Sequence, residues 1–182
     1  TLVCQDWGGL LGLTLPHEYR DRFRRMIVMN TTLAVGKAPT QGFIDWRNYV
    51  ASRPDLDVAG LMKRSSPILS DAEAAAYGAP FPDQRAKAGV RRFPQLVMTD
   101  PAMPGVEISR PARDYFRSEW DGPCFMALGA ADPVLGGPVM QKLHADIRGA
   151  GPMMVIEEAG HFVQEWGEPI ARAALDYFAA QA

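Results

Sequence analysis

The stretch that decides the fold is Leu2-Val3-Cys4-Gln5-Asp6-Trp7-Gly8-Gly9, at the start of the 182-residue sequence. Its apolar beginning predicts a short strand, and Gly8 leaves room for a sharp turn into a helix that begins at Trp7. The turn would present Asp6 just past the end of the strand. A carboxylate in this place can attack an alkyl carbon and form an ester that water must hydrolyse. In a simpler interpretation, Asp6 only caps the helix.

Two later residues favour the catalytic interpretation. Asp132 follows the apolar run Cys124-Phe125-Met126-Ala127-Leu128-Gly129, and His161 follows the run Met153-Met154-Val155-Ile156. Open α/β sheets place their sites beyond the carboxyl ends of parallel strands. Taken singly, Asp132 before Pro133 is often a turn, and a loop histidine is often a surface residue. In the order Asp6, Asp132, His161, however, the three match the nucleophile, acid and base of a catalytic triad.

The rest of the chain predicts an α/β fold with an inserted helical region. Strand patterns recur at 25–30, 123–129 and 152–157, with helices at 7–14, 138–148 and 169–180. Strand signals are missing between these groups, where prolines interrupt helical stretches and Ser70-Asp71-Ala72-Glu73 forms a capping box. We therefore expect a core made of residues 1–32 and 105–182 and a helical cap at 33–104.

Several segments resemble haloalkane dehalogenases of the α/β-hydrolase superfamily. They are Val3-Cys4-Gln5-Asp6-Trp7-Gly8-Gly9, Ala79-Pro80-Phe81-Pro82-Asp83 with Gly89-Val90-Arg91-Arg92-Phe93-Pro94, and Gly160-His161-Phe162-Val163-Gln164-Glu165. Gly42-Phe43-Ile44-Asp45-Trp46 is similar to the cap segment of the dichloroethane-degrading subfamily. The general hydrolase pattern has a glycine where this chain has Cys4, a departure that dehalogenases of this type tolerate. The resemblance runs from Thr1 to the C-terminus and implies the C-terminal part of an α/β-hydrolase fold.

The resemblance also implies a mechanism. Asp6 would displace halide from a small halogenated alkane, and His161, oriented by Asp132, would activate water against the resulting ester. The indole N–H groups of Trp7 and Trp46 would hold the halide, although a tryptophan such as Trp46 is also a common core residue. An apolar substrate pocket is implied, lined by Leu10, Phe43, Phe81, Pro82, Val134 and Leu135. Neither a cofactor nor a metal is expected.

A second position for the acid lies after the strand at 25–30, where some relatives carry it. The residue here is Asn30. A neutral amide cannot stabilise an imidazolium by charge, so the acid role is assigned to Asp132. The other histidines, His17 and His144, lack a comparable context and are interpreted as solvated surface residues.

Composition restricts the class of protein. The sequence is 47% hydrophobic and 22% charged with a net charge of −2, which indicates an ordinary globular protein without a bias toward nucleic acid. No apolar run is long enough to cross a bilayer. Cys4 and Cys124 are expected to be buried reduced thiols, which favours a cytoplasmic protein.

The position of Asp6 predicts that more of the protein precedes it. Haloalkane dehalogenases carry several strands and a loop with the second oxyanion-hole donor ahead of the nucleophile, whereas this sequence starts at Thr1. We expect a C-terminal fragment of a protein that is a monomer when full length. In the fragment, Leu2-Val3-Cys4 would form an exposed apolar edge.

Two alternative functions remain at this point. The first is an epoxide hydrolase, which shares the triad but needs cap tyrosines to protonate the opening ring. Tyr49 and Tyr77 are the only tyrosines between Leu33 and Gly105. The second is a non-catalytic truncated α/β-hydrolase fragment.

Overall fold

The computed structural model describes residues 1–181, which form two compact units. Unit 1 combines Thr1–Lys37 with the chain from Met98 onwards, and unit 2 is Ala38–Val97. The helical region expected at 33–104 overlaps unit 2, whose bounds lie a few residues inside the expected ones.

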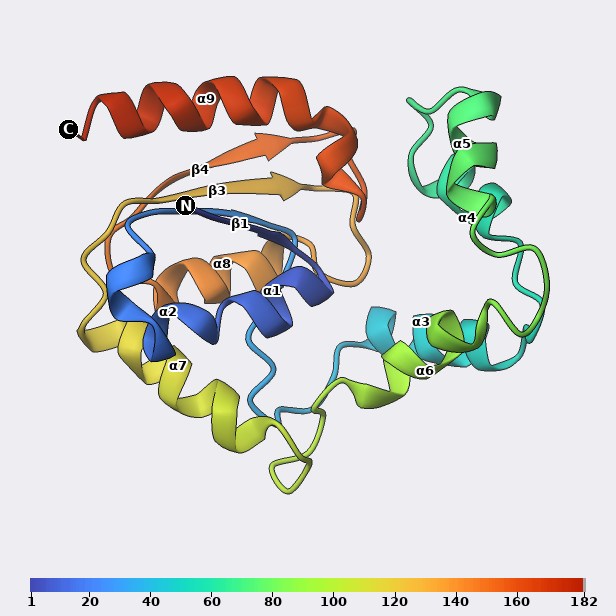
Figure 1. Cartoon of the computed structure of the whole chain (residues 1–182), viewed down its shortest axis with the longest axis horizontal. Helices are drawn as coiled ribbons and strands as arrows, with labels where there is room; N and C mark the ends of the chain where they lie inside the picture. Colours follow the sequence, from blue (N-terminus) through green and yellow to red (C-terminus); the bar gives the residue numbers. More distant parts are fainter. Residues whose placement is uncertain (182) are drawn as a thin grey trace. The chain divides into compact units, whose positions relative to one another are not determined.

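Unit 1 is built on a parallel sheet. Its strands are β1 (Leu2–Gln5), β2 (Met26–Met29), β3 (Cys124–Gly129) and β4 (Ala150–Ile156), in the spatial order β1-β2-β3-β4 (Figure 1). All neighbouring pairs are parallel, so the carboxyl ends of the strands lie at one edge of the sheet. The expected α/β class is confirmed.

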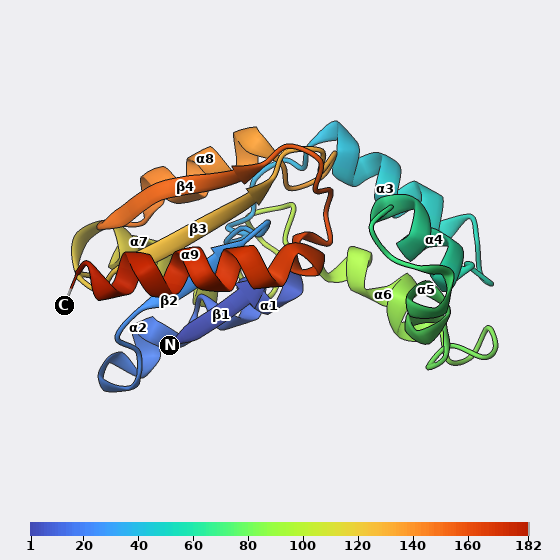
Figure 2. The same ribbon diagram turned by 90° about the horizontal axis from the view of Figure 1, so that it is seen from above.

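Helices cover both faces of this sheet. α9 (Gly167–Ala179) lies on one face, and the other face is covered by α1 (Trp7–Gly12), α2 (Leu15–Glu18), α7 (Val106–Ser118) and α8 (Gly137–Asp146) (Figures 1 and 2). Short 3₁₀ helices are η1 (Arg20–Arg22) and η2 (Val163–Trp166).

The strand sequence explains the two layers. Met126 and Leu128 of β3 pack into the cluster that contains Met140 of α8, whereas Phe125 packs into the cluster that contains Phe178 of α9. Successive strand residues point to opposite faces. Because both faces are covered, every residue of β3 is buried, and the strand is a continuous apolar run without alternation.

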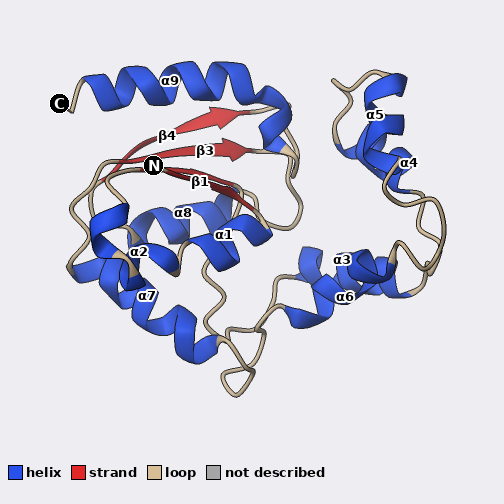
Figure 3. Ribbon diagram, in the orientation of Figure 1, coloured by secondary structure: helices blue, strands red, loops and turns tan. Residues whose placement is uncertain are grey.

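Unit 2 consists of helices in its described residues (Figure 3). They are α3 (Gln41–Ala51), α4 (Val58–Ser65), α5 (Asp71–Gly78) and α6 (Ala88–Leu96). Side chains of Thr40, Asp57 and Ser70 cap the first three helices at their N-termini. The capping box predicted at Ser70 is confirmed, with the Glu73 carboxylate accepting from the Ser70 backbone N–H.

β1 forms an edge of the described sheet, but it is less exposed than the sequence predicts. Val3 is 57% exposed, whereas Cys4 is only 4% exposed because its side chain points into the core cluster beneath α1. The expected exposed apolar edge is therefore limited to one face of the strand. Cys4 and Cys124 are both buried free thiols, as predicted.

The prediction for the two other histidines was wrong. His17 is half-buried against the ring of Tyr115, with ring centroids 5.6 Å apart, because α2 packs on α7. The His144 ring is also half-buried, and its Nε2 lies 2.8 Å from the carbonyl oxygen of Gly151.

Helices of a membrane-spanning length and apolarity are not found within residues 1–181.

Candidate active site

Asp6 lies on a strained turn between β1 and α1. It is the one residue other than glycine with a positive φ among the described residues, with φ 47° and ψ −122°. Such a conformation costs about 1–3 kcal/mol and persists only where surrounding contacts hold it. The Asp6 carbonyl accepts from the N–H groups of Gly9 (2.9 Å) and Leu10 (3.2 Å) and from Thr31 Oγ1 (2.6 Å). The Asp6 N–H donates to the Asn30 carbonyl (3.0 Å), so the turn is fixed from two sides.

The glycine that this turn needs most is Gly9. A Cβ on Gly9 would lie 2.0 Å from Thr31 Oγ1, whereas a Cβ on Gly8 would meet only the Cys4 Cβ at 4.0 Å. The sequence pattern points to Gly8 as the position of close backbone packing. Within the described chain, the closer approach is at Gly9, because Thr31 crosses the start of α1 to reach the Asp6 carbonyl.

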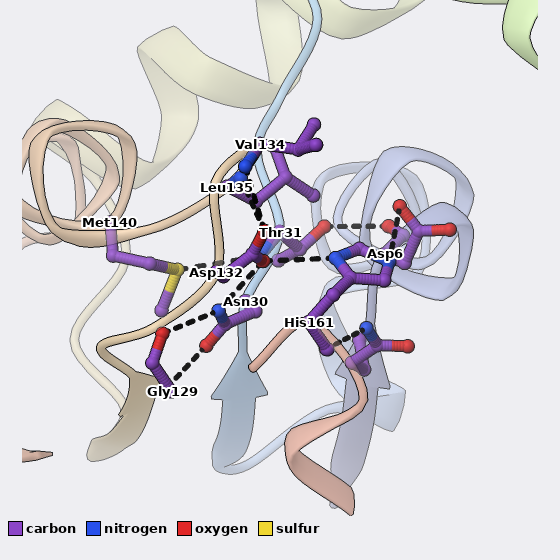
Figure 4. Close-up of polar contacts among 10 residues, drawn as sticks. Asp6, Asn30, Thr31, Gly129, Asp132, Val134, Leu135, Met140 and His161 are labelled. Atoms are coloured by element: carbon purple, nitrogen blue, oxygen red, sulfur yellow. Dashed lines mark hydrogen bonds and ion pairs between the residues drawn. The ribbon is translucent and has the colours of Figure 1, made fainter. Parts of the chain in front are cut away.

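Asp132 is a buried carboxylate, and both of its oxygens accept hydrogen bonds (Figure 4). Its side chain is 0% exposed. Oδ1 accepts from the N–H groups of Val134 (2.8 Å) and Leu135 (3.1 Å), and Oδ2 accepts from Asn30 Nδ2 (2.8 Å) and lies 2.9 Å from His161 Nδ1. Burial alone would raise the pKa of Asp132, but the hydrogen bonds from His161, Asn30 and Val134 outweigh it and hold this pKa below its usual value. The carboxylate therefore stays charged inside the protein.

His161 lies between two carboxylates in the loop after β4. Its Nδ1 contacts Asp132, and its Nε2 lies 3.6 Å from Asp6 Oδ1. Gln5 Nε2 donates to the His161 carbonyl (2.9 Å) and so ties this loop to the end of β1. Burial favours the neutral ring, but the hydrogen bonds and charges of Asp132 and Asp6 outweigh it and raise the pKa of His161 well above its usual value.

The structure thus brings the three predicted triad residues into one polar chain that runs Asp132, His161, Asp6 (Figure 4). The side chain of Asp132 is sealed from solvent, whereas that of Asp6 is 36% exposed. A buried acid, a ring that it orients and an accessible carboxylate are what covalent hydrolysis through an ester requires.

The other predicted site residues fall into two groups. Trp7, Leu10, Val134 and Leu135 belong to unit 1. Trp7 directly follows Asp6 and is half-buried, and Leu10 is 5% exposed in the same helix. Val134 and Leu135 are half-buried, and their backbone N–H groups donate to Asp132 Oδ1.

The remaining predicted residues belong to unit 2, which is described by itself. Phe43 and Trp46 are half-buried residues of α3, and the Trp46 ring stacks on Tyr49 with centroids 6.0 Å apart. Phe81 is half-buried and Pro82 is exposed in the segment between α5 and α6. Their roles in halide or substrate binding stay predictions.

The sequence reasoning missed the part played by Asn30 and Thr31. Both residues are 0% exposed, and between them they bond to each of the two carboxylate-bearing residues. The available signal was a pair of polar residues directly after a buried strand, at the edge where Asp6 and Asp132 were already expected.

No group of three or more His, Cys, Asp or Glu side chains arranged to hold a metal ion is found within residues 1–181.

Comparison with known proteins agrees with this geometry. A family profile described as the alpha/beta hydrolase fold matches residues 1–168. The chain belongs to this family.

Curated relatives of this hydrolase-fold chain are haloalkane dehalogenases. It is 38% identical to the haloalkane dehalogenase of Psychrobacter cryohalolentis, over 97% of the chain and 59% of the relative. It is 36% identical to haloalkane dehalogenase 1 of Mycobacterium tuberculosis, over 91% of the chain and 55% of the relative. The predicted resemblance to haloalkane dehalogenases is confirmed, and the chain spans somewhat more than half the length of these relatives.

Solved structures of haloalkane dehalogenases are also similar to this chain. The haloalkane dehalogenase DpaA of Paraglaciecola agarilytica, described as tetrameric, matches with a TM-score of 0.92 and 43% identity over 96% of this chain and 58% of that one. The haloalkane dehalogenase DatA of Agrobacterium tumefaciens matches with a TM-score of 0.71 at 17% identity, a likeness that shows the fold alone.

Proposed function

We propose that the protein hydrolyses the carbon–halogen bond of short haloalkanes through an ester on Asp6. The observation that supports this most directly is a carboxylate at the turn after β1, with His161 Nε2 at 3.6 Å and the buried Asp132 behind the ring. The relatives with 36–38% identity carry the haloalkane dehalogenase name.

The first step is alkylation of Asp6. One carboxylate oxygen attacks the sp³ carbon that bears the halogen, a carbon–oxygen bond forms, and the halide leaves with the electron pair of the broken bond. Indole N–H groups are donors without an acceptor to repel an anion, so Trp7 and Trp46 are assigned to the departing halide. Leu10, Phe43, Phe81, Pro82, Val134 and Leu135 are assigned to the apolar pocket, which favours a short haloalkane over a polar substrate.

The second step is hydrolysis of the ester. Alkylation removes the negative charge of Asp6, one of the two charges that raise the pKa of His161. The ring then more readily gives up its Nε2 proton and can take one from water. Hydroxide attacks the carbonyl carbon of the ester, the bond from that carbon to the alkyl oxygen breaks, and the alcohol leaves with a proton. One proton remains in excess and passes to solvent, while Asp132 stabilises the imidazolium.

Several wider assignments accompany this function. Unit 2, placed between the two segments of unit 1 in sequence, is assigned as the cap. We expect the full-length protein to be a monomer. DpaA is described as tetrameric, so sedimentation analysis of the full-length protein decides between a monomer and a tetramer. The buried free thiols Cys4 and Cys124 are consistent with a cytoplasmic location.

The atom balance supplies a direct test. In the ester route, the oxygen of water enters the Asp6 carboxylate and the alcohol receives an old carboxylate oxygen. A single turnover in ¹⁸O-water, with protein expressed from its complete coding sequence and a bromoalkane, should therefore label Asp6 and release unlabelled alcohol. Labelled alcohol with unlabelled Asp6 would mean direct attack by water and would refute the ester.

Variants test the roles of the triad. Asp6→Asn should abolish turnover, and His161→Gln should retain the alkyl mass on Asp6 because hydrolysis lacks its base. Asp114→Asn, which changes an exposed carboxylate that pairs with its neighbour Arg113, is the matched control and should keep full activity. An alkyl group on another residue would contradict the assignment of Asp6. Parallel assays with epoxides separate this function from an epoxide hydrolase, and a full-length protein inactive on both would be the non-catalytic alternative.

A further inference from the structure

The residues Asn30 and Thr31 follow β2, which lies between the strands that lead to the two carboxylates. β2 pairs with β1 on one side and with β3 on the other, and Met29 is in register with both Gln5 and Ala127. Asp6 follows β1, and Asp132 follows β3. The end of β2 is therefore within reach of both acidic residues, and Figure 4 shows Asn30 next to Asp132 and Thr31 on the side toward Asp6.

Both polar atoms of the Asn30 side chain form hydrogen bonds. Nδ2 donates to Asp132 Oδ2 (2.8 Å) and to the Gly129 carbonyl (3.1 Å), and Oδ1 accepts from the Gly129 N–H (2.8 Å). The Gly129 contacts fix the orientation of the amide, so its donor has to point at Asp132. Asp132 Oδ2 is also the oxygen that faces His161 Nδ1 at 2.9 Å. A neutral donor holds this oxygen in place without removing the negative charge that the histidine needs.

Thr31 acts on the other carboxylate-bearing residue. Its Oγ1 donates to the Asp6 carbonyl (2.6 Å), and the neighbouring Asn30 carbonyl accepts from the Asp6 N–H (3.0 Å). These contacts hold the backbone of Asp6, the residue with φ 47°, on both sides. The Thr31 N–H points to the sulfur of Met140 in α8 (3.3 Å), which anchors this threonine in the core.

We propose that the Asn30-Thr31 pair, here called the β2 clamp, positions the two carboxylates of the reaction separately, Thr31 for alkylation through Asp6 and Asn30 for ester hydrolysis through Asp132 and His161. The assignment to steps rests on the proposed function. Neither side chain is required to touch the substrate, so both are positioning residues. They act through hydrogen bonds to Asp6 and Asp132.

Thr31 offers a matched pair of variants. Thr31→Val keeps the shape and removes the hydroxyl, and Thr31→Ser keeps the hydroxyl. In single-turnover assays on the complete protein with a bromoalkane, Thr31→Val should slow halide release about tenfold, the size expected for one lost buried hydrogen bond. Thr31→Ser should restore most of that rate. Decay of the ester should change much less than its formation.

Asn30→Leu should show the opposite split. The variant keeps a similar volume and removes the donor to Asp132, so ester hydrolysis should slow about 100-fold, as expected when a catalytic group is misplaced. Alkylation should stay within a few-fold, and the ester should accumulate during turnover. Thermal unfolding shows whether Asn30→Leu folds. If it does not, the smaller Asn30→Ala variant is used in its place.

Two measurements test the clamp without any substrate. The low-field proton resonance of His161 Nδ1–H should shift or broaden in Asn30→Leu and stay unchanged in Thr31→Val. Hydrogen exchange of the Leu10 amide, which donates to the Asp6 carbonyl, should accelerate in Thr31→Val and not in Asn30→Leu.

The outcomes are separable. If the unaltered protein releases no halide, the proposed function fails while resonance and exchange still decide the clamp. An unchanged His161 resonance in Asn30→Leu, or equal exchange in both variants, overturns the separate positioning. Equal slowing of both chemical steps by each variant, with Thr31→Ser no better than Thr31→Val, also overturns it, since that pattern indicates general loss of structure.

Discussion

Removal of the Asp6 charge should lower the pKa of His161. Asp6 Oδ1 lies 3.6 Å from His161 Nε2, and the hydrogen bonds and charges of Asp132 and Asp6 raise the pKa of the ring to about 10 against the opposing effect of burial. Asn in place of Asp6 keeps the size of the side chain and removes one of these charges. The same loss of charge occurs when Asp6 becomes an ester, so the variant imitates the electrostatics of the intermediate.

The magnitude follows from the distance. At 3.6 Å, two unit charges interact by about 1.2 kcal/mol in water and about 4.6 kcal/mol at an effective dielectric constant of about 20. The Asp6 side chain is 36% exposed, so solvent screening favours the lower end. One pKa unit corresponds to about 1.4 kcal/mol. We therefore expect Asp6→Asn to lower the pKa of His161 by about 1.

NMR titration of the His161 ring in the complete protein measures this change. Asp132→Asn should lower the pKa of His161 further, because Asp132 Oδ2 is only 2.9 Å from Nδ1 and its side chain is 0% exposed. Asp114→Asn on the surface of α7 should leave it unchanged. If the pKa of His161 were the same in Asp6→Asn as in the unaltered protein, the charge of Asp6 would not act on the ring. Ester formation could then not shift the ring toward the neutral form that accepts a proton from water.

Three further predictions concern stability and halide binding. Because folding raises the pKa of His161, this residue should contribute stability that is complete below about pH 6.5 and is lost as the pH rises toward about 10; chemical denaturation of the unaltered protein against His161→Gln over this range measures it, and a difference that grows with pH would contradict it. Gly9→Ala should destabilise the fold by about 1–3 kcal/mol, since the added Cβ would meet Thr31 Oγ1 at 2.0 Å. Gly8→Ala should cost much less, and equal losses of melting temperature in the two variants would show that the Thr31 contact does not limit this turn. Bromide should quench indole fluorescence less in Trp46→Phe than in the unaltered protein, and equal quenching would remove Trp46 from the halide site.

The sequence by itself predicted the elements that depend on short stretches of chain. The apolar runs that became β2, β3 and β4 were visible as strands, and in β3 every residue is buried because helices cover both faces of the sheet. The order of Asp6, Asp132 and His161, each just after such a run, predicted that their side chains would meet. The capping box at Ser70 was equally local, because its two hydrogen bonds join residues three apart.

Only the tertiary structure decided which other groups surround these three residues. Asn30 bonds to Asp132 across 102 positions and Thr31 to Asp6 across 25, and the lateral order of the strands makes both contacts. The sequence set Asn30 aside as an acid on charge grounds, yet a polar residue after a buried strand does not by itself show that its amide donates to Asp132. The need for a glycine at position 9 more than at position 8 arises in the same way, from Thr31, which follows the neighbouring strand β2. Contacts of this kind depend on which strands lie side by side, and local sequence patterns do not carry that information.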